Sequence, residues 1–145
     1  MPGIRYSPMA SGVAVVAVSV PIDITTAEQL RAVLLRASSH RHVAVVVDLT
    51  QASSCDSAGL RTLVRAHRRA RAEGGELRLV VPADGAVIRT LVLTGLHRLI
   101  PCFNRLDQAL DLRPAARDLT DALAPPPRLA QVIASGRQAG PGGVN

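Results

Sequence analysis

A serine hydroxyl lies where a short polar loop meets a long helical pattern. The segment is DSAGL, residues 56–60, and its serine is Ser57. Oxygens on the side chains of Asp56 and Ser57 can accept hydrogen bonds from the free backbone N–H groups of a first helical turn. The same donors and the helix dipole favour an anion there, such as a phosphoryl group on Ser57. The residue types therefore predict a modifiable hydroxyl at a helix start.

A buried strand is predicted directly before this loop. Residues 43–47 read VAVVV, an apolar and mostly β-branched run that is typical of a strand covered on both faces. Asp48-Leu49-Thr50 ends the strand, and the small polar loop 51–55 follows. The serine is thus expected just beyond the carboxyl end of a central strand.

The rest of the chain alternates between strand and helix patterns. Further strands are predicted over residues 3–7, 13–20, 76–81 and 99–103, the first and last of them at sheet edges. Helices are predicted over residues 25–38 and 57–73, then one capped by Asp84 that ends near Thr94-Gly95, and a last one capped by Asn104. Thr25 and Glu28 have the spacing of a capping box for the first helix. This order predicts an α/β sandwich, a mixed sheet of about five strands with about four helices mainly on one face.

Composition limits the class of protein. The 145 residues suit one domain, expected over 1–112, followed by a Pro- and Gly-rich, mostly disordered tail over 113–145. With 48% hydrophobic and almost no aromatic residues, the core must be aliphatic, and bases would find no stacking platform. No apolar run reaches the ~18 residues of a membrane span, and no signal-peptide pattern opens the chain, so we expect a cytoplasmic protein without membrane insertion.

Charge and cysteine spacing narrow the partners further. The net charge of +6, carried by arginine alone, is compatible with an acidic partner and does not demand nucleic acid. Arg61, Arg65, Arg68 and Arg69 form an outer row on the helix after Ser57, either as a solvated face or as a docking surface for an acidic partner. Cys55 and Cys102 lack the spacing of a zinc site, so neither a metal nor a cofactor is predicted.

Two short motifs together resemble the phosphorylation motif of anti-sigma factor antagonists, which belong to the STAS domain family. They are Asp48-Leu49-Thr50 and, after the loop, Asp56-Ser57-Ala58-Gly59-Leu60, and the resemblance covers roughly residues 3–112. It implies a bacterial regulator of transcription that binds an anti-sigma factor with a histidine-kinase-like ATPase domain. It further implies that this partner phosphorylates Ser57 and is thereby released, and that Asp23 lies close to the serine.

The resemblance and the arginine row define the expected partner-binding residues. They are Asp23, Asp56, Ser57, Ala58, Gly59, Arg61 and Arg65. No catalytic residue is predicted, because neither a GxSxG elbow nor a Cys/His pairing accompanies Ser57 or Cys55. Weak self-association stays open.

The motif departs from the family's pattern at two places. Ala58 stands where the family has a second hydroxyl residue, and Ser54-Cys55 replaces an aromatic–aliphatic pair. An alternative therefore stays open, in which the chain is a non-phosphorylated STAS subunit of a lipid or anion transport complex or of a stress-sensing complex.

Overall fold

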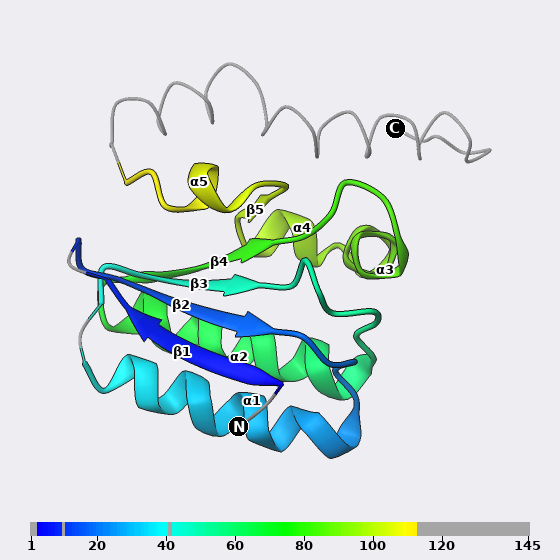
Figure 1. The fold of residues 1–145 in the computed structure, drawn as a ribbon, viewed down its shortest axis with the longest axis horizontal. Helices are drawn as coiled ribbons and strands as arrows, with labels where there is room; N and C mark the ends of the chain where they lie inside the picture. The colour runs from blue at the N-terminus through cyan, green and yellow to red at the C-terminus, as the bar shows by residue number, and fades with distance from the viewer. Residues whose placement is uncertain (1–2, 10, 41, 113–145) are drawn as a thin grey trace.

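The computed structural model describes residues 3–9, 11–40 and 42–112. In this part of the chain a five-stranded sheet carries helices on both sides (Figure 1). The strands are β1 (Ile4–Pro8), β2 (Val13–Val18), β3 (Ala44–Asp48), β4 (Glu76–Val80) and β5 (Cys102–Phe103). The helices are α1 (Ile24–Ser38), α2 (Ser57–Ala72), α3 (Ala86–Thr94), α4 (Leu96–Leu99) and α5 (Leu106–Ala109). The predicted mixed α/β sandwich is confirmed, and the prediction for the tail, 113–145, lies outside the described residues.

The strands lie in the sheet in their order along the chain. β1 pairs with β2 antiparallel, and the pairs β2–β3, β3–β4 and β4–β5 are parallel. The edge strands are β1 and the two-residue β5, as the sequence predicted. Because β2, β3 and β4 run in the same direction, the loops that follow them leave the sheet at one end.

Alternate residues of the central strands belong to two hydrophobic clusters. The larger one gathers Val16 of β2 and Val47 of β3 with buried residues of α1, α2 and α3. The smaller one gathers Val46 of β3 with Ala109 of α5 on the opposite face. Figure 1 shows α1 and α2 on one side of the sheet and α5 on the other. Both faces of β3 are therefore covered, as its unbroken apolar sequence predicted.

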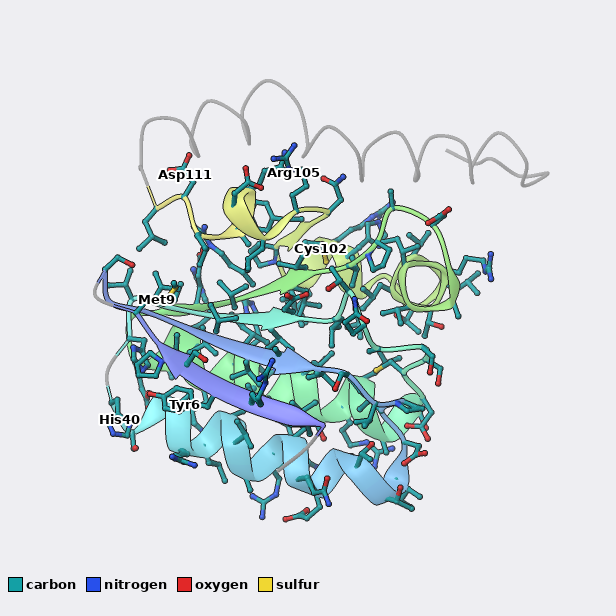
Figure 2. All side chains as sticks on the ribbon, in the orientation of Figure 1. Tyr6, Met9, His40, Cys102, Arg105 and Asp111 are labelled. Atoms are coloured by element: carbon teal, nitrogen blue, oxygen red, sulfur yellow. The ribbon has the colours of Figure 1, made fainter. Side chains whose placement is uncertain are left out.

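A buried arginine holds α5 against the sheet. The side chain of Arg78 in β4 is fully buried, and its Nη1 donates to the carbonyl oxygens of Ala109 at 2.8 Å and Asp111 at 2.9 Å. Its guanidinium pairs with Glu76 and lies 5.4 Å from the ring centroid of Phe103. Asp111 is seen beside α5 in Figure 2. The sequence carries no signal for this contact, because Arg78 stands in an ordinary polar position of an alternating strand.

The amino-terminal end of β3 is tied to the edge strand β1. The hydroxyl of Tyr6 lies 2.8 Å from Nε2 of His42, and the guanidinium of Arg36 lies 5.5 Å from the Tyr6 ring centroid. Tyr6 and His40 lie together at this end of the molecule in Figure 2. These contacts connect β1 with α1 and with the residues just before β3, at the end of the sheet where β3 starts.

Three predicted helix and strand ends were wrong. The caps expected from Asp84 and Asn104 do not form, because the N-cap residues are Gly85 for α3 and Arg105 for α5, and neither makes a side-chain cap hydrogen bond. The last strand is shorter than predicted, since the short α4 occupies Leu96–Leu99. Gly95 closes α3 in the left-handed conformation, with φ of +77°, as its glycine predicted.

Candidate functional site

Two loops are joined by backbone hydrogen bonds beyond the carboxyl ends of β2 and β3. Ile22 and Cys55 form an isolated parallel bridge. The N–H of Ile22 donates to the carbonyl of Ser54 at 2.8 Å, and the N–H of Asp56 donates to the carbonyl of Ile22 at 2.9 Å. Both bridged residues are buried. Because Asp23 and Asp56 each follow a bridged residue, the starts of α1 and α2 lie side by side.

Asp23 caps the first turn of α1. Its Oδ1 accepts hydrogen bonds from the N–H groups of Thr25 at 2.9 Å and Thr26 at 3.2 Å, and Thr26 Oγ1 accepts from the N–H of Asp23 at 2.9 Å. The capping box thus joins Asp23 and Thr26, and the box predicted for Thr25 and Glu28 was wrong. The hydroxyl of Thr25, helped by the backbone donors, lowers the pKa of the Asp23 carboxyl below its ordinary value. Asp23 therefore carries a negative charge at neutral pH.

Asp56 caps the first turn of α2 in the same way. Its Oδ1 accepts from the N–H groups of Ala58 at 3.0 Å and Gly59 at 3.1 Å. The N–H of Leu60 donates to the carbonyl of Asp56 at 2.9 Å. Asp56 thus takes two of the donors that the sequence offered to an anion, and the prediction that this helix start favours a phosphoryl group stays a prediction.

Ser57 is the first residue of α2, and its side chain is exposed. The cap predicted for its hydroxyl does not form, since Asp56 takes that role. Among the described residues, no hydrogen bond engages the Ser57 hydroxyl. Ser57 therefore presents a free hydroxyl between the carboxylate of Asp56 and the outer face of α2.

Gly59 lets α2 approach the bridge closely. A Cβ at this position would lie 2.5 Å from Cγ2 of Ile22 and 2.7 Å from Sγ of Cys55, far inside ordinary contact distance. Both of these side chains are buried. Gly59, one of the predicted partner-binding residues, is itself buried, and its close packing on Ile22 and Cys55 sets the position of Ser57.

The thiol of Cys55 is buried beneath this site. Burial, together with the nearby negative charge of Asp56, raises the pKa of the Cys55 thiol to about 12. At neutral pH the group is almost entirely protonated, and a protonated thiol is a weak nucleophile.

Three arginines share the outer face of α2 with Ser57. Arg61, Arg65 and Arg68 follow Ser57 at intervals of three or four residues, and all are exposed. The opposite face of the helix is buried through Gly59, Leu60, Leu63, Ala66 and His67. Within the described part of the chain, none of the three arginines forms an ion pair. The fourth member of the predicted row, Arg69, is half-buried, so from here on the arginine row means Arg61, Arg65 and Arg68.

The residues that the structure describes were also compared with the requirements of a metal site and of a membrane-spanning helix. No cluster of three or more His, Cys, Asp or Glu side chains able to hold a metal ion occurs there. None of the described helices combines the length and the apolar character needed to cross a bilayer.

Comparisons with known proteins agree with this architecture. Residues 8–109 match the family model of the STAS domain. A crystal structure of an anti-sigma factor antagonist from Mycobacterium paratuberculosis is similar with a TM-score of 0.68 and 31% identity, covering 74% of this chain and 89% of that chain. No curated protein sequence matches the chain.

Two structures of the anti-sigma factor antagonist SpoIIAA share the fold. The unphosphorylated form gives a TM-score of 0.65 at 19% identity, covering 80% of this chain and 97% of that one. The phosphorylated form, from Bacillus, gives a TM-score of 0.57 at 18% identity, covering 75% and 97%.

Proposed function

Because the chain belongs to the STAS domain family, we propose that it is an anti-sigma factor antagonist controlled by phosphorylation of Ser57. In the unphosphorylated state it binds an anti-sigma factor that carries a histidine-kinase-like ATPase domain, and so frees a sigma factor for transcription. The partner then transfers the γ-phosphoryl group of ATP to the Ser57 oxygen, releasing ADP and a proton, and the complex dissociates. The similar solved structures that are named anti-sigma factor antagonists support this role.

The observation that carries the proposal is the joined pair of capped helix starts. The Ile22–Cys55 bridge holds Asp23 and Asp56 beside one another, and the free hydroxyl of Ser57 stands next to them. A kinase needs an exposed hydroxyl on a surface that it can bind, and these features supply both. Asp23, Asp56 and Ser57 form the centre of the proposed partner surface, with Ala58 at its margin.

Charge explains why phosphorylation should end the interaction. A phosphoserine adds about −1.5 to −2 charges at pH 7. In the complex this charge would be desolvated against the partner beside two carboxylates, those of Asp23 and Asp56, and a buried anion without a partner is strongly unfavourable. Arg61 and Arg65 extend the proposed surface along α2, where they suit an acidic region of the anti-sigma factor.

The test is phosphosite mapping with a purified anti-sigma factor kinase from the same genome. The full chain is incubated with the kinase and ATP, and phosphate is located by mass spectrometry in the wild type, Ser57→Ala and Ser53→Ala. We expect stoichiometric label on Ser57, loss of label in Ser57→Ala, and full label in Ser53→Ala, since Ser53 is also an exposed serine, in the loop before α2.

Two results would contradict the proposal. Label on Ser53, Ser54 or Thr50 with none on Ser57 would show that another hydroxyl is the acceptor. Binding without any phosphate transfer would favour the non-phosphorylated STAS subunit, which Ala58 and Ser54-Cys55 suggest.

A further inference from the structure

A phosphoryl group on Ser57 would find three of the nearby helix donors already engaged. The N–H groups of Ala58 and Gly59 donate to the side chain of Asp56, and that of Leu60 donates to the Asp56 carbonyl. The adjacent Asp56 carboxylate would also repel the phosphate, because like charges at this range are unfavourable. Fewer backbone donors are therefore left for a phosphate than at an uncapped helix start, so a positive side chain would add to the attraction.

Arg61 is the first cation of α2 and lies on the Ser57 face. Residues four apart on a helix rise about 6 Å along the axis, with about 5–6 Å between their Cβ atoms. A guanidinium on a flexible side chain can span this distance to a phosphate and bind two of its oxygens at once. Arg61 is exposed and forms no ion pair with any described residue, so nothing in that part of the chain competes for it.

The position of Arg61 does not serve the stability of the helix. Arg61 lies just past the first turn of α2, where the helix dipole gives a cation no stabilisation. Arg61 and Arg65 are also like charges at a four-residue spacing, which destabilises a helix. The Asp56 carboxylate caps this helix start, but no residue of the first turn itself is acidic. An acid placed at Ser57 would remove this imbalance.

We propose that Arg61 is the internal counter-ion of a phosphoryl group on Ser57, an inference that rests on the proposed phosphorylation of this residue. Phosphorylation then acts twice on the partner surface. It adds negative charge at Ser57, and it withdraws Arg61 from the arginine row, leaving Arg65 and Arg68 to face the acidic region of the partner. The phosphorylated state is thereby stabilised within the free protein.

The experiment uses the full chain with phosphoserine installed at position 57 during translation, so that no kinase is needed. The second pKa of the phosphate, ordinarily about 6, is measured by phosphorus NMR over a pH titration. A neighbouring cation favours the dianion and lowers this pKa. Arg61→Gln is compared with Arg65→Gln, which removes the same charge from the same face about 12 Å from Ser57 along the axis, beyond the ~8 Å screening length of physiological salt.

We expect Arg61→Gln to raise the phosphate pKa by about 0.3 or more, Arg65→Gln to change it by less than about 0.1, and Arg61→Lys to restore part of the shift. Equal shifts in Arg61→Gln and Arg65→Gln, or no shift in either, would overturn the pairing. A kinase that labels another residue would refute the proposed function without changing this titration, so the two failures are distinguishable.

Discussion

Replacing Ser57 with aspartate should separate the stability of the domain from its binding to the anti-sigma factor. The exposed Ser57 side chain makes no hydrogen bond in the described chain, so nothing is lost when it is replaced. A carboxylate in the first helical turn is stabilising by about 0.3–1 kcal/mol, and a pair with Arg61 adds about 0.2–0.5 kcal/mol. Repulsion from the neighbouring Asp56 carboxylate opposes this by up to about 1 kcal/mol in water. These contributions combine to between about −0.5 and +1.5 kcal/mol, so we expect a net change that is near zero or modestly in favour of Ser57→Asp.

Binding should change in the opposite direction and by more. The added carboxylate would face the partner beside Asp23 and Asp56, where the wild type presents a neutral hydroxyl. We expect the dissociation constant for the anti-sigma factor to rise at least tenfold, which corresponds to about 1.4 kcal/mol. Ser57→Ala should bind like the unphosphorylated wild type, because it keeps the neutral surface.

Two alanine variants calibrate the stability measurement. The sequence suggested that Ser57→Ala removes a helix cap, but Asp56 is the capping residue. Ser57→Ala should therefore stay within about 0.5 kcal/mol of the wild type, as surface substitutions usually do. Asp56→Ala should lose about 0.5–2 kcal/mol, because it leaves the N–H groups of Ala58 and Gly59 without their acceptor.

Differential scanning calorimetry of the four proteins gives the stabilities, and isothermal titration calorimetry with the purified anti-sigma factor gives the affinities. A melting temperature of Ser57→Asp at or slightly above that of the wild type, with a tenfold weaker affinity, is the expected pattern. Equal affinities for the wild type and Ser57→Asp would refute the charge argument. A clear loss of stability in Ser57→Asp would show that repulsion from Asp56 outweighs the helix dipole and Arg61.

Three further predictions concern the packing and stability of the domain that carries the site. Gly59→Ala should destabilise the domain by about 1–2 kcal/mol in chemical denaturation, because the clash of its Cβ with Ile22 and Cys55 exceeds the gain of about 1 kcal/mol in helix propensity; an increase in stability would refute the close approach. Burial raises the pKa values of the Cys55 and Cys102 thiols to about 12 from an ordinary 9.0, so both should resist a thiol-reactive disulfide reagent at pH 8 until urea unfolds the domain. Since the unfolded thiols ionise first, the free energy of unfolding should fall as pH rises above about 9, and a flat profile in urea titrations at pH 8 to 10.5 would contradict this. A chain truncated before Pro114 should melt within a few degrees of the full chain, because the Pro and Gly content of the tail is unsuited to covering a core. Unfolding of the truncated domain would show instead that the tail packs against it.

The sequence predicted the parts of the fold that have a strong local signal. The valine run of β3 has no polar position, and it is covered on both faces as expected. Ser57 stands at a helix start because Asp56 offers a capping oxygen directly before a 3.6-residue apolar pattern. In both places the local preference and the tertiary structure agree, so pattern and fold coincide.

The site depends on contacts that leave no local pattern. The Ile22–Cys55 bridge joins two loops through a single residue pair. Neither loop has a periodic sequence pattern from which its pairing with the other loop could be predicted. At the start of α1 the sequence spacing suggested a capping box of Thr25 and Glu28, but the box of Asp23 and Thr26 forms instead. It forms because the Asp23 carboxylate accepts both backbone and hydroxyl donors. The burial of Arg78 is likewise decided by distant carbonyls, those of Ala109 and Asp111. Such choices are made by tertiary structure, which a single sequence does not display.

The rigid support of Ser57 favours a switch that works by charge and not by rearrangement of the loops. Gly59 is packed against the buried Ile22 and Cys55, so α2 cannot move toward the bridge, and a shift away from it would leave a void. Moving the start of α2 would also break the cap of Asp56 and the hydrogen bond from its N–H to Ile22. The exposed side chains of Ser57 and Arg61 can change partners without disturbing any of these contacts. Phosphorylation at this position would therefore redistribute charge on a fixed surface, and the partner would respond to the changed charge.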